Sequence, residues 1–488
     1  MNDFLKLDQS PIHQAAATSD IATLSELFSA GHDINAKIDA AEGWGIFYLG
    51  VTPLMVAACS PHGATVETLQ WLIDHSADIT LQATGKITAT WYAAGNGIFP
   101  RERDAEHYRN QLEKLRLLLS LGAAPNETAD NGRSLLVEAC RVGDAQRVAL
   151  LLEYGASVEP MLGAISPNYQ RSWAEGCSPL SSYQIPLFNA VSSGSADCVQ
   201  QLLEAGVDIH LCTNGRETAL MYARNPDIVK MLLDAGIDMT ISGKHGWDAF
   251  QEILEQEVED EQEEAEIVRS LQILIQHGAD INATQRGEPR IYYAAFAQNP
   301  FAIERLLKLE ATPSANRPLL SAITWHCNHE YDDEIARAID LLVTAGTDVN
   351  ARDAAGDTLL HNATLEYGLA PSEENYFGSS DGCNYTAVKR LLHHGAYPDP
   401  AGVNGRTPLM LATLCASAKT LQVLLAAGAN PHQKDHAGQT ALDIARQAYE
   451  TLKVDTSKYT EDQAIYTTKL QARTDCLELL TSAGLPPQ

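Results

Sequence analysis

Two short patterns alternate along nearly the whole chain at a period of about thirty-odd residues, and this self-similarity limits the possible folds more than any other feature. The first pattern is clearest in segments 52–55 and 407–410, both Thr-Pro-Leu-Met. Thr accepts a backbone N–H bond as an N-cap, and Pro fits the first helical position because no donor is needed there. Each copy of this pattern therefore predicts the start of a helix.

The second pattern is Leu-Leu followed by a glycine and an acidic or amide residue, as in segments 202–208 and 424–430. Gly206 and Gly428 are suited to the left-handed conformation that ends a helix. Two amphipathic segments lie between successive patterns, and neither can bury its apolar face alone. The sequence therefore predicts stacked helix-turn-helix units.

These residues resemble the ankyrin repeat family, and the resemblance extends from Ser10-Pro11-Ile12-His13 to Ala483-Gly484. It implies an all-α solenoid of helix-turn-helix units with short β-hairpin fingers, in which residues 1–488 form one array of about twelve units. The units are expected to open near Ser10, Thr52, Thr88, Ser134, Ile185, Thr218, Asp248, Pro289, Arg317, Thr358, Thr407 and Thr440.

Two units, at His13 and His361, keep the histidine of the family's opening tetrapeptide. The family implies that this side chain bonds to the opening hydroxyl of its own unit or of a neighbouring one. We interpret both histidines as packing and hydrogen-bonding residues, with no catalytic part.

Insertions interrupt the period and must emerge as surface loops. Two of them, near 41–50 and 159–184, fall at finger positions and are rich in aromatic residues, which are common interface anchors. The alternative is that these side chains cover the next unit. The predicted anchors are Trp44, Phe47, Tyr48, Tyr169, Trp173 and Tyr183.

The other insertions are predicted between the two helices of a unit. Residues 255–264 are almost entirely carboxylates, which is typical of a solvated helix or loop and could also meet a basic patch on a partner. These insertions lie near 96–108, 254–266, 325–334, 365–385 and 448–469.

The chain carries 63 acidic and 34 basic residues among its 488, for a formal net charge of -29. This charge disfavours nucleic acid and anionic lipid and favours a basic protein partner, although it also serves simple solubility. Nine cysteines without paired spacing favour a reducing cytoplasm. We expect neither an export signal nor a membrane span.

The sequence predicts no catalytic residue, metal or cofactor. The densest group of possible metal ligands is His326, Cys327, His329 and Glu330, but it lacks the spacing of a zinc site. His393 and His394 are interpreted as the end of a second helix, where a cation complements the helix dipole.

We therefore expect a solenoid that binds one large protein partner, with finger tips such as Arg216, Glu217 and Asp353 in contact with it. An immunity protein that neutralises a bacterial toxin is one hypothesis. A signalling or adaptor scaffold, or an effector delivered into a host, is the alternative, and a metal-dependent enzyme is a remote one. The oligomeric state is left open.

Overall fold

The computed structural model describes residues 10–38, 50–59, 64–94, 105–129, 132–160, 182–285, 287–297, 299–312, 332–353, 355–364, 385–454 and 463–483. The chain forms two compact units, Met1–Ala279 and Asp280–Gln488.

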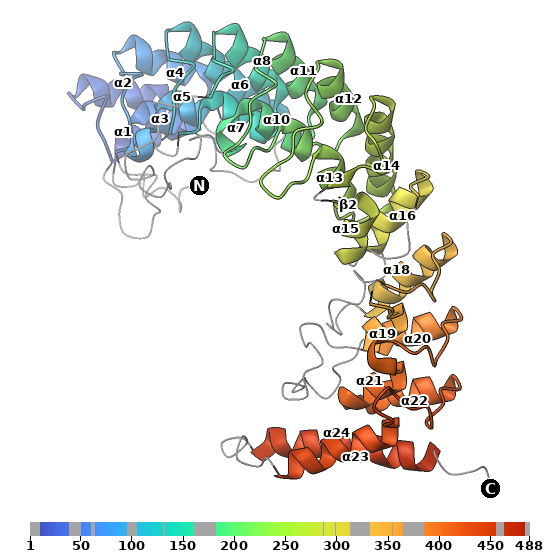
Figure 1. Cartoon of the computed structure of the whole chain (residues 1–488). Helices are drawn as coiled ribbons and strands as arrows, with labels where there is room; N and C mark the ends of the chain where they lie inside the picture. The colour runs from blue at the N-terminus through green and yellow to red at the C-terminus, as the bar shows by residue number, and fades with distance from the viewer. Residues whose placement is uncertain are drawn as a thin grey trace. The chain divides into compact units, whose positions relative to one another are not determined.

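The first unit consists of paired helices joined by short turns (Figure 1). Its elements are α1 (Pro11–Thr18), α2 (Ile21–Ser29), α3 (Pro53–Cys59), α4 (Val66–Asp74), η3 (Thr84–Lys86), α5 (Ala89–Ala93), α6 (Ala105–Ser120), α7 (Leu135–Arg141), α8 (Ala145–Glu153), η4 (Ser182–Gln184), α10 (Pro186–Ser192), α11 (Ala196–Glu204), η5 (Ala219–Tyr222), α12 (Pro226–Asp234), α13 (Ala249–Leu254) and α14 (Glu261–Gln276).

The second unit begins with a short β-hairpin of two two-residue strands and then repeats the same pattern of paired helices. Its elements are β1 (Thr284–Gln285), β2 (Glu288–Pro289), α15 (Arg290–Phe296), α16 (Pro300–Lys308), α18 (Asp332–Thr344), α19 (Leu359–Thr364), α20 (Tyr385–His393), η7 (Val403–Gly405), α21 (Pro408–Leu414), α22 (Ala418–Ala426), α23 (Ala441–Val454) and α24 (Gln463–Ala483).

Helices start where the opening pattern predicts them. Every predicted opening residue that the structure describes is followed directly by a helix, and Arg317 lies outside the described residues. Several of these starts are capped: the side chains of Thr88, Ser134 and Thr407 each accept a bond from the backbone N–H three residues on.

The unit that opens at Thr218 differs, because η5 is one short 3₁₀ turn instead of an α-helix. Thr218 makes no capping bond, and the second helix of this unit already starts at Pro226. The segment between these two residues is too short for two helical turns and a connecting turn.

The helices of consecutive repeats pack side by side in two layers. First helices pack on first helices, as α1 on α3, α3 on α5 and α7 on α10, and second helices form the other layer, as α8, α11, α12 and α14 do (Figure 1). The second unit repeats this arrangement with α19, α21 and α23 on one side and α16, α18, α20, α22 and α24 on the other. An all-α ankyrin-type stack is therefore confirmed within each unit.

Left-handed residues end the second helices. Gly206 has φ +81°, and its amide and that of Val207 bond back to the carbonyls of Leu203 and Leu202. Ser76 and Glu310 occupy this position in other repeats at φ 72° and 65°, where a side chain is disfavoured.

His13 and His361, the two histidines of the opening pattern, join one repeat to the next, as expected. His13 contacts Ser10 Oγ at 2.7 Å and the Val51 carbonyl of the following repeat at 3.0 Å. Burial lowers the pKa of His13 to about 4. His361 makes the equivalent bonds to Thr358 and to the Arg406 carbonyl. Their hydrogen-bonding interpretation is confirmed.

Several predicted insertions coincide with lengthened helices. Residues 448–454 continue α23 and residues 463–469 begin α24, so these two helices pack on each other over much of their length. In the long helix α6, the buried Lys114 donates its Nζ to the Ala57 carbonyl in α3 at 2.9 Å. Burial lowers the pKa of Lys114 to about 8.

A half-buried carboxylate offers a test of the stack. The hydroxyl of Thr88, the cap of α5, donates to the carboxylate of Glu127 in the next finger. Burial raises the pKa of Glu127 from 4.5 to about 7. The folded state therefore binds the proton more tightly than the unfolded state, and stability is lost as pH rises from about 4.5 to about 7.

We predict that Glu127→Gln removes this pH dependence, because the amide keeps an acceptor for Thr88 without a buried charge. At pH 8 the variant should be more stable than the wild type by roughly 1–2 kcal/mol, and at pH 4.5 it should have no advantage. Denaturant unfolding at both pH values measures the difference. Glu113→Gln, on the exposed side of α6, is the matched control; an equal response of both variants would contradict the assignment.

Candidate functional site

The predicted contact residue Arg216 lies at the tip of a finger. Arg216 is exposed and adopts φ 60°, and its amide bonds to the Thr213 carbonyl at 2.9 Å. The neighbouring finger packs against this one, since the Lys244 amide bonds to the Gly215 carbonyl at 2.7 Å. The turn therefore presents an arginine to solvent on a fixed backbone.

Glu217, predicted to contact a partner, is engaged within the finger. Its Oε2 accepts bonds from Thr213 Oγ1 at 2.9 Å and from Tyr222 Oη at 2.7 Å. Burial, followed by the bond to Glu217, raises the pKa of Tyr222 to about 12. The carboxylate thus holds the finger against η5, a role that its sequence position did not indicate.

Asp353 also shapes its own turn. Its Oδ1 accepts bonds from the amides of Ala355 at 2.8 Å and Asp357 at 3.0 Å. This is the Asx arrangement that favours Asp in turns. Arg352, which the sequence analysis did not single out, is the exposed neighbour, and its Nη1 reaches the Ala401 carbonyl of the next finger at 2.7 Å.

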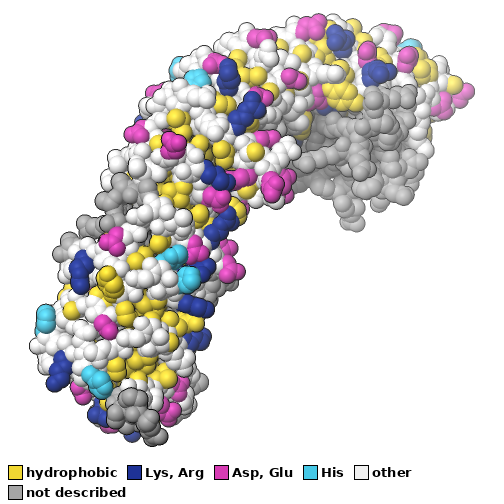
Figure 2. Space-filling model, turned by 90° about the vertical axis from the view of Figure 1, so that its right-hand side faces the viewer, with side chains coloured by type: hydrophobic (Ala, Val, Ile, Leu, Met, Phe, Trp, Pro, Cys, Tyr) yellow, Lys and Arg dark blue, Asp and Glu magenta, His cyan; other side chains and the backbone are white. Residues whose placement is uncertain are grey.

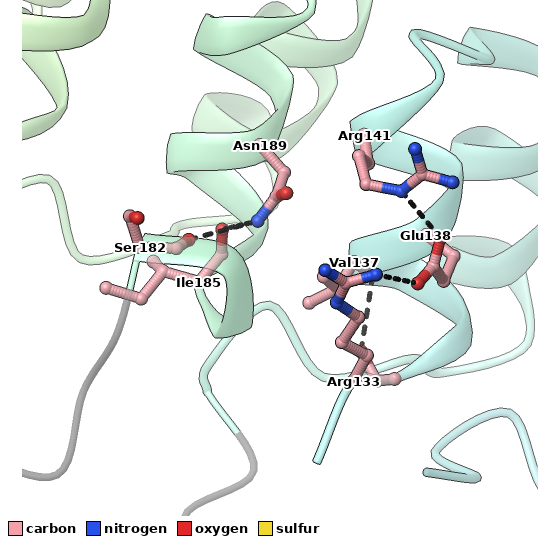
Figure 3. A network of polar contacts seen from close by, with 8 residues as sticks. Arg133, Val137, Glu138, Arg141, Ser182, Ile185 and Asn189 are labelled. Carbon is pink, nitrogen blue, oxygen red and sulfur yellow. Dashed lines mark hydrogen bonds and ion pairs between the residues drawn. The ribbon is translucent and has the colours of Figure 1, made fainter. Parts of the chain in front are cut away.

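The aromatic insertions lie mostly outside the described residues. This holds for Trp44, Phe47, Tyr48, Tyr169 and Trp173 and for the side chain of Tyr183. The described ends are well anchored: Ile38 and Val51 form an antiparallel bridge on either side of the first insertion. Asn189 Nδ2 donates to the carbonyls of Ser182 and Ile185 where the second insertion meets α10 (Figure 3).

A carboxylate held between two arginines lies on α7, across from this anchored segment (Figure 3). Glu138 accepts Arg133 Nη1 at 3.0 Å and Arg141 Nε at 2.8 Å, and only 7% of its side chain is exposed. The Arg141 side chain is 43% exposed, and its terminal nitrogens have no acceptor among the described residues. The sequence alone does not indicate this group, because its only local signal is the three-residue spacing of Glu138 and Arg141.

The first helices themselves offer little free surface. Every residue from Pro53 to Ala58 in α3, from Ala89 to Ala93 in α5 and from Pro186 to Val191 in α10 is buried. On the side of the first helices and fingers, accessible side chains therefore come from finger tips and helix ends such as Arg141 and Arg216.

The acidic run, residues 255–264, is half-buried to exposed, and its last part begins α14. Asp260 accepts the amides of Gln262 and Glu263, and Glu263 accepts the Glu259 amide, so these two carboxylates cap α14. Glu257, Glu259 and Glu261 are exposed, and their side chains form no hydrogen bond or ion pair with another residue that the structure describes. Figure 2 shows acidic and basic side chains interspersed over the face that it presents.

Outer helices of the second unit border an open depression of about 520 Å³ between α16 and α18, with Leu307, Ala311, Leu341 and Ala345 among its lining residues. Its charges are paired locally: Asp340 binds Arg390 at 2.8 Å and His394 at 2.7 Å. His394 directly follows α20, so the helix-end interpretation of this histidine pair is confirmed.

No group of three or more metal-binding side chains occurs among the described residues, and His326, Cys327, His329 and Glu330 lie outside them. In the same part of the chain, no helix combines the length and apolar character needed to span a membrane. The six cysteines that the structure describes are free thiols, and Cys140, Cys198 and Cys476 are buried.

Comparisons with known proteins locate the repeats independently. A model of the ankyrin repeat matches residues 49–84 and 404–436, and a model of three such repeats matches residues 170–242. The E3 ubiquitin-protein ligase KEG of Arabidopsis thaliana is 24% identical over 351 residues, which cover 66% of this chain and 18% of that protein. Ankyrin repeat and SOCS box protein 16 of Mus musculus is 25% identical over 312 residues, which cover 63% of this chain and 57% of that protein.

Among solved structures, the ankyrin repeat domain of human ASB11 is 21% identical and aligns with a TM-score of 0.36, covering 49% of this chain and 90% of that one. The chain spans less than two thirds of the length of the curated relatives named above. The repeat signatures, the helix starts that follow them and the matching repeat models agree, and the matched segments 49–84, 170–242 and 404–436 are ankyrin repeats.

Proposed function

We propose that this ankyrin protein binds and sequesters one basic protein partner in the cytoplasm and catalyses no reaction itself. The observation that carries the proposal is the distribution of charge. Residues 1–279 hold 38 acidic and 17 basic residues, whereas residues 280–488 hold 25 and 17. A strongly acidic surface attracts a basic protein and speeds its association.

The acidic run supports this proposal more specifically. No lysine or arginine occurs between Lys244 and Arg269, a stretch that carries ten carboxylates. Three of them, Glu257, Glu259 and Glu261, serve neither the cap of α14 nor any described ion pair. Exposed charge of one sign without local compensation is the arrangement that steers a partner of opposite sign.

The finger side supplies the specific contacts in this proposal. Arg216 is exposed at a finger tip, and Arg141 is held in place by Glu138 with its terminal nitrogens available. Glu217 and Asp353 hold the finger turns and contribute through the shape they fix. The six aromatic residues of the two insertions, named above, are proposed as anchors, since large aromatics contribute most of the binding energy at many interfaces.

A bacterial toxin is the partner that we propose in particular, which would make the chain an immunity protein. A charged, irregular surface suits recognition of one cognate partner because each insertion can match only one complementary shape. The second candidate is an adaptor scaffold. It is favoured by the likeness to eukaryotic proteins such as the SOCS box protein, in which the match covers only part of a longer chain.

We predict that the chain, produced together with a toxin that co-purifies from its native cell, restores growth. The reason is that a sequestered toxin cannot reach its target. Colony counts with and without the chain measure the rescue. Partner capture without any rescue would favour the scaffold over the immunity protein.

We predict that replacing Glu257, Glu259 and Glu261 with Gln slows association with the recovered partner several-fold at low salt and flattens its salt dependence. Stopped-flow or surface-based kinetics at several salt concentrations measure both effects. The matched control replaces three exposed carboxylates of the second unit, Glu310, Asp333 and Glu478, with their amides. Equal effects of the two triple variants would show that only net charge matters.

We predict that Trp44→Ala and Trp173→Ala each weaken partner binding by about 2 kcal/mol, while the midpoint of thermal unfolding changes little. Calorimetric titration and a thermal scan of the same sample separate the two roles. A lowered unfolding midpoint with unchanged affinity would assign the tryptophans to covering the neighbouring repeat.

A further inference from the structure

Three aromatic rings from neighbouring second helices meet on the outer layer of the first unit. Phe28 of α2 approaches Trp71 of α4 edge to face, with ring centroids 6.2 Å apart, and it approaches His75 in the same way at 5.2 Å. The ring of His75 stacks on that of Trp71 at 3.9 Å. We call Phe28, Trp71 and His75 the outer aromatic patch.

Local structure fixes the orientation of these rings. His75 follows Trp71 by four residues, and its Nδ1 donates to the Trp71 carbonyl at 2.7 Å. This bond holds the imidazole flat on the indole and settles which ring nitrogen carries the hydrogen. The patch is therefore already in place before any partner arrives.

The three rings of the patch lie outside the buried core of the stack. The buried residues of α4 are Thr68, Leu69 and Leu72, and that of α2 is Leu24, so none of the three patch residues is among them. Phe28 stays 39% exposed, and Trp71 and His75 are only half-buried. An exposed group of large rings on a helix pair is a common sign of a contact surface.

The surroundings of the patch select the charge of a partner. Glu67 precedes Trp71 by four residues, so Glu67, Trp71 and His75 share one face of α4. Asp74 is exposed beside His75 and uses one oxygen to accept Gln70 Nε2 at 2.8 Å. Lys37 is the sole lysine or arginine between residues 7 and 85, and its Nζ is bonded to the Gln82 carbonyl at 3.2 Å.

We propose that the outer aromatic patch binds an arginine of the basic partner, an inference that rests on the proposed function and adds a second contact surface to it. Arginine suits the patch because its planar guanidinium packs on aromatic rings and its donors reach carboxylates. Glu67 and Asp74 pair with the positive charge of the guanidinium, and the face of the Phe28 ring packs against the guanidinium plane and the aliphatic part of the arginine side chain.

The test uses the full chain labelled with 5-fluorotryptophan and titrated with hexa-arginine and hexalysine peptides. Trp71→Phe identifies the resonance of Trp71 among the six tryptophans. We expect hexa-arginine to shift this resonance more than hexalysine does, and Phe28→Ala to weaken hexa-arginine binding about three- to fivefold at unchanged net charge. Leu121→Ala, another exposed apolar residue of the outer layer, is the control and should bind as the wild type does.

Two results would overturn the proposal: a Trp71 resonance that stays fixed while peptide binds, or equal peptide affinity of Phe28→Ala and the control. Thermal unfolding of each variant verifies that the chain is folded, and Glu67→Gln with Asp74→Asn provides a second route to the same loss. A basic partner that binds through the fingers alone would leave the proposed function standing and the patch refuted. Conversely, if the patch binds hexa-arginine but no basic protein partner is recovered from the native cell, the proposed function is refuted and the patch is not.

Discussion

Burial of each repeat against the next is the interaction on which the described structure depends. A pair of short helices exposes its apolar face until a neighbour covers it, and the main helix contacts within a unit join helices of one repeat or of repeats adjacent in sequence. Polar bridges reinforce this: His13 reaches the carbonyl of Val51, His361 that of Arg406, and Thr88 the carboxylate of Glu127. Because the side chains of His13, His361 and Thr88 are buried, a repeat that loses its neighbour leaves polar groups without a partner as well as exposing apolar surface.

The same dependence explains what the sequence could predict. Caps and terminal glycines act within a few residues, so the helix starts after Thr52, Ser134 and Thr407 follow from local chemistry. The 3₁₀ turn after Thr218 depends on the short distance to the next helix start at Pro226, and the opening pattern itself contains no information about that distance. Lys114 beneath α3 and Phe28 beside Trp71 involve residues more than forty positions apart, and nothing in either local sequence indicates such a contact.

The candidate site shows the same limit to what local sequence can predict. Residue type and turn position select Arg216, Glu217 and Asp353 equally, yet the side chains differ in what remains available to a partner. Glu217 and Asp353 use their oxygens to hold the turns, whereas Arg216 is exposed. Arg141 could not be selected from sequence because its fixed position comes from a buried carboxylate, and the burial of Glu138 is a property of the packed stack.

Positions that serve the stack and positions open to a partner are largely separate in this chain. The carboxylates Asp260 and Glu263 are committed to the start of α14, while Glu257, Glu259 and Glu261 beside them are not. In the same way Leu72 is buried in α4 while Trp71, its neighbour in sequence, lies on the outer face. Since helical and turn geometry place adjacent residues on different faces, a partner surface can change by substitution at every second or third position without loss of the repeat contacts. This separation gives physical grounds for the irregularity of the repeats: selection for one partner can act on the exposed positions while the buried ones keep the stack.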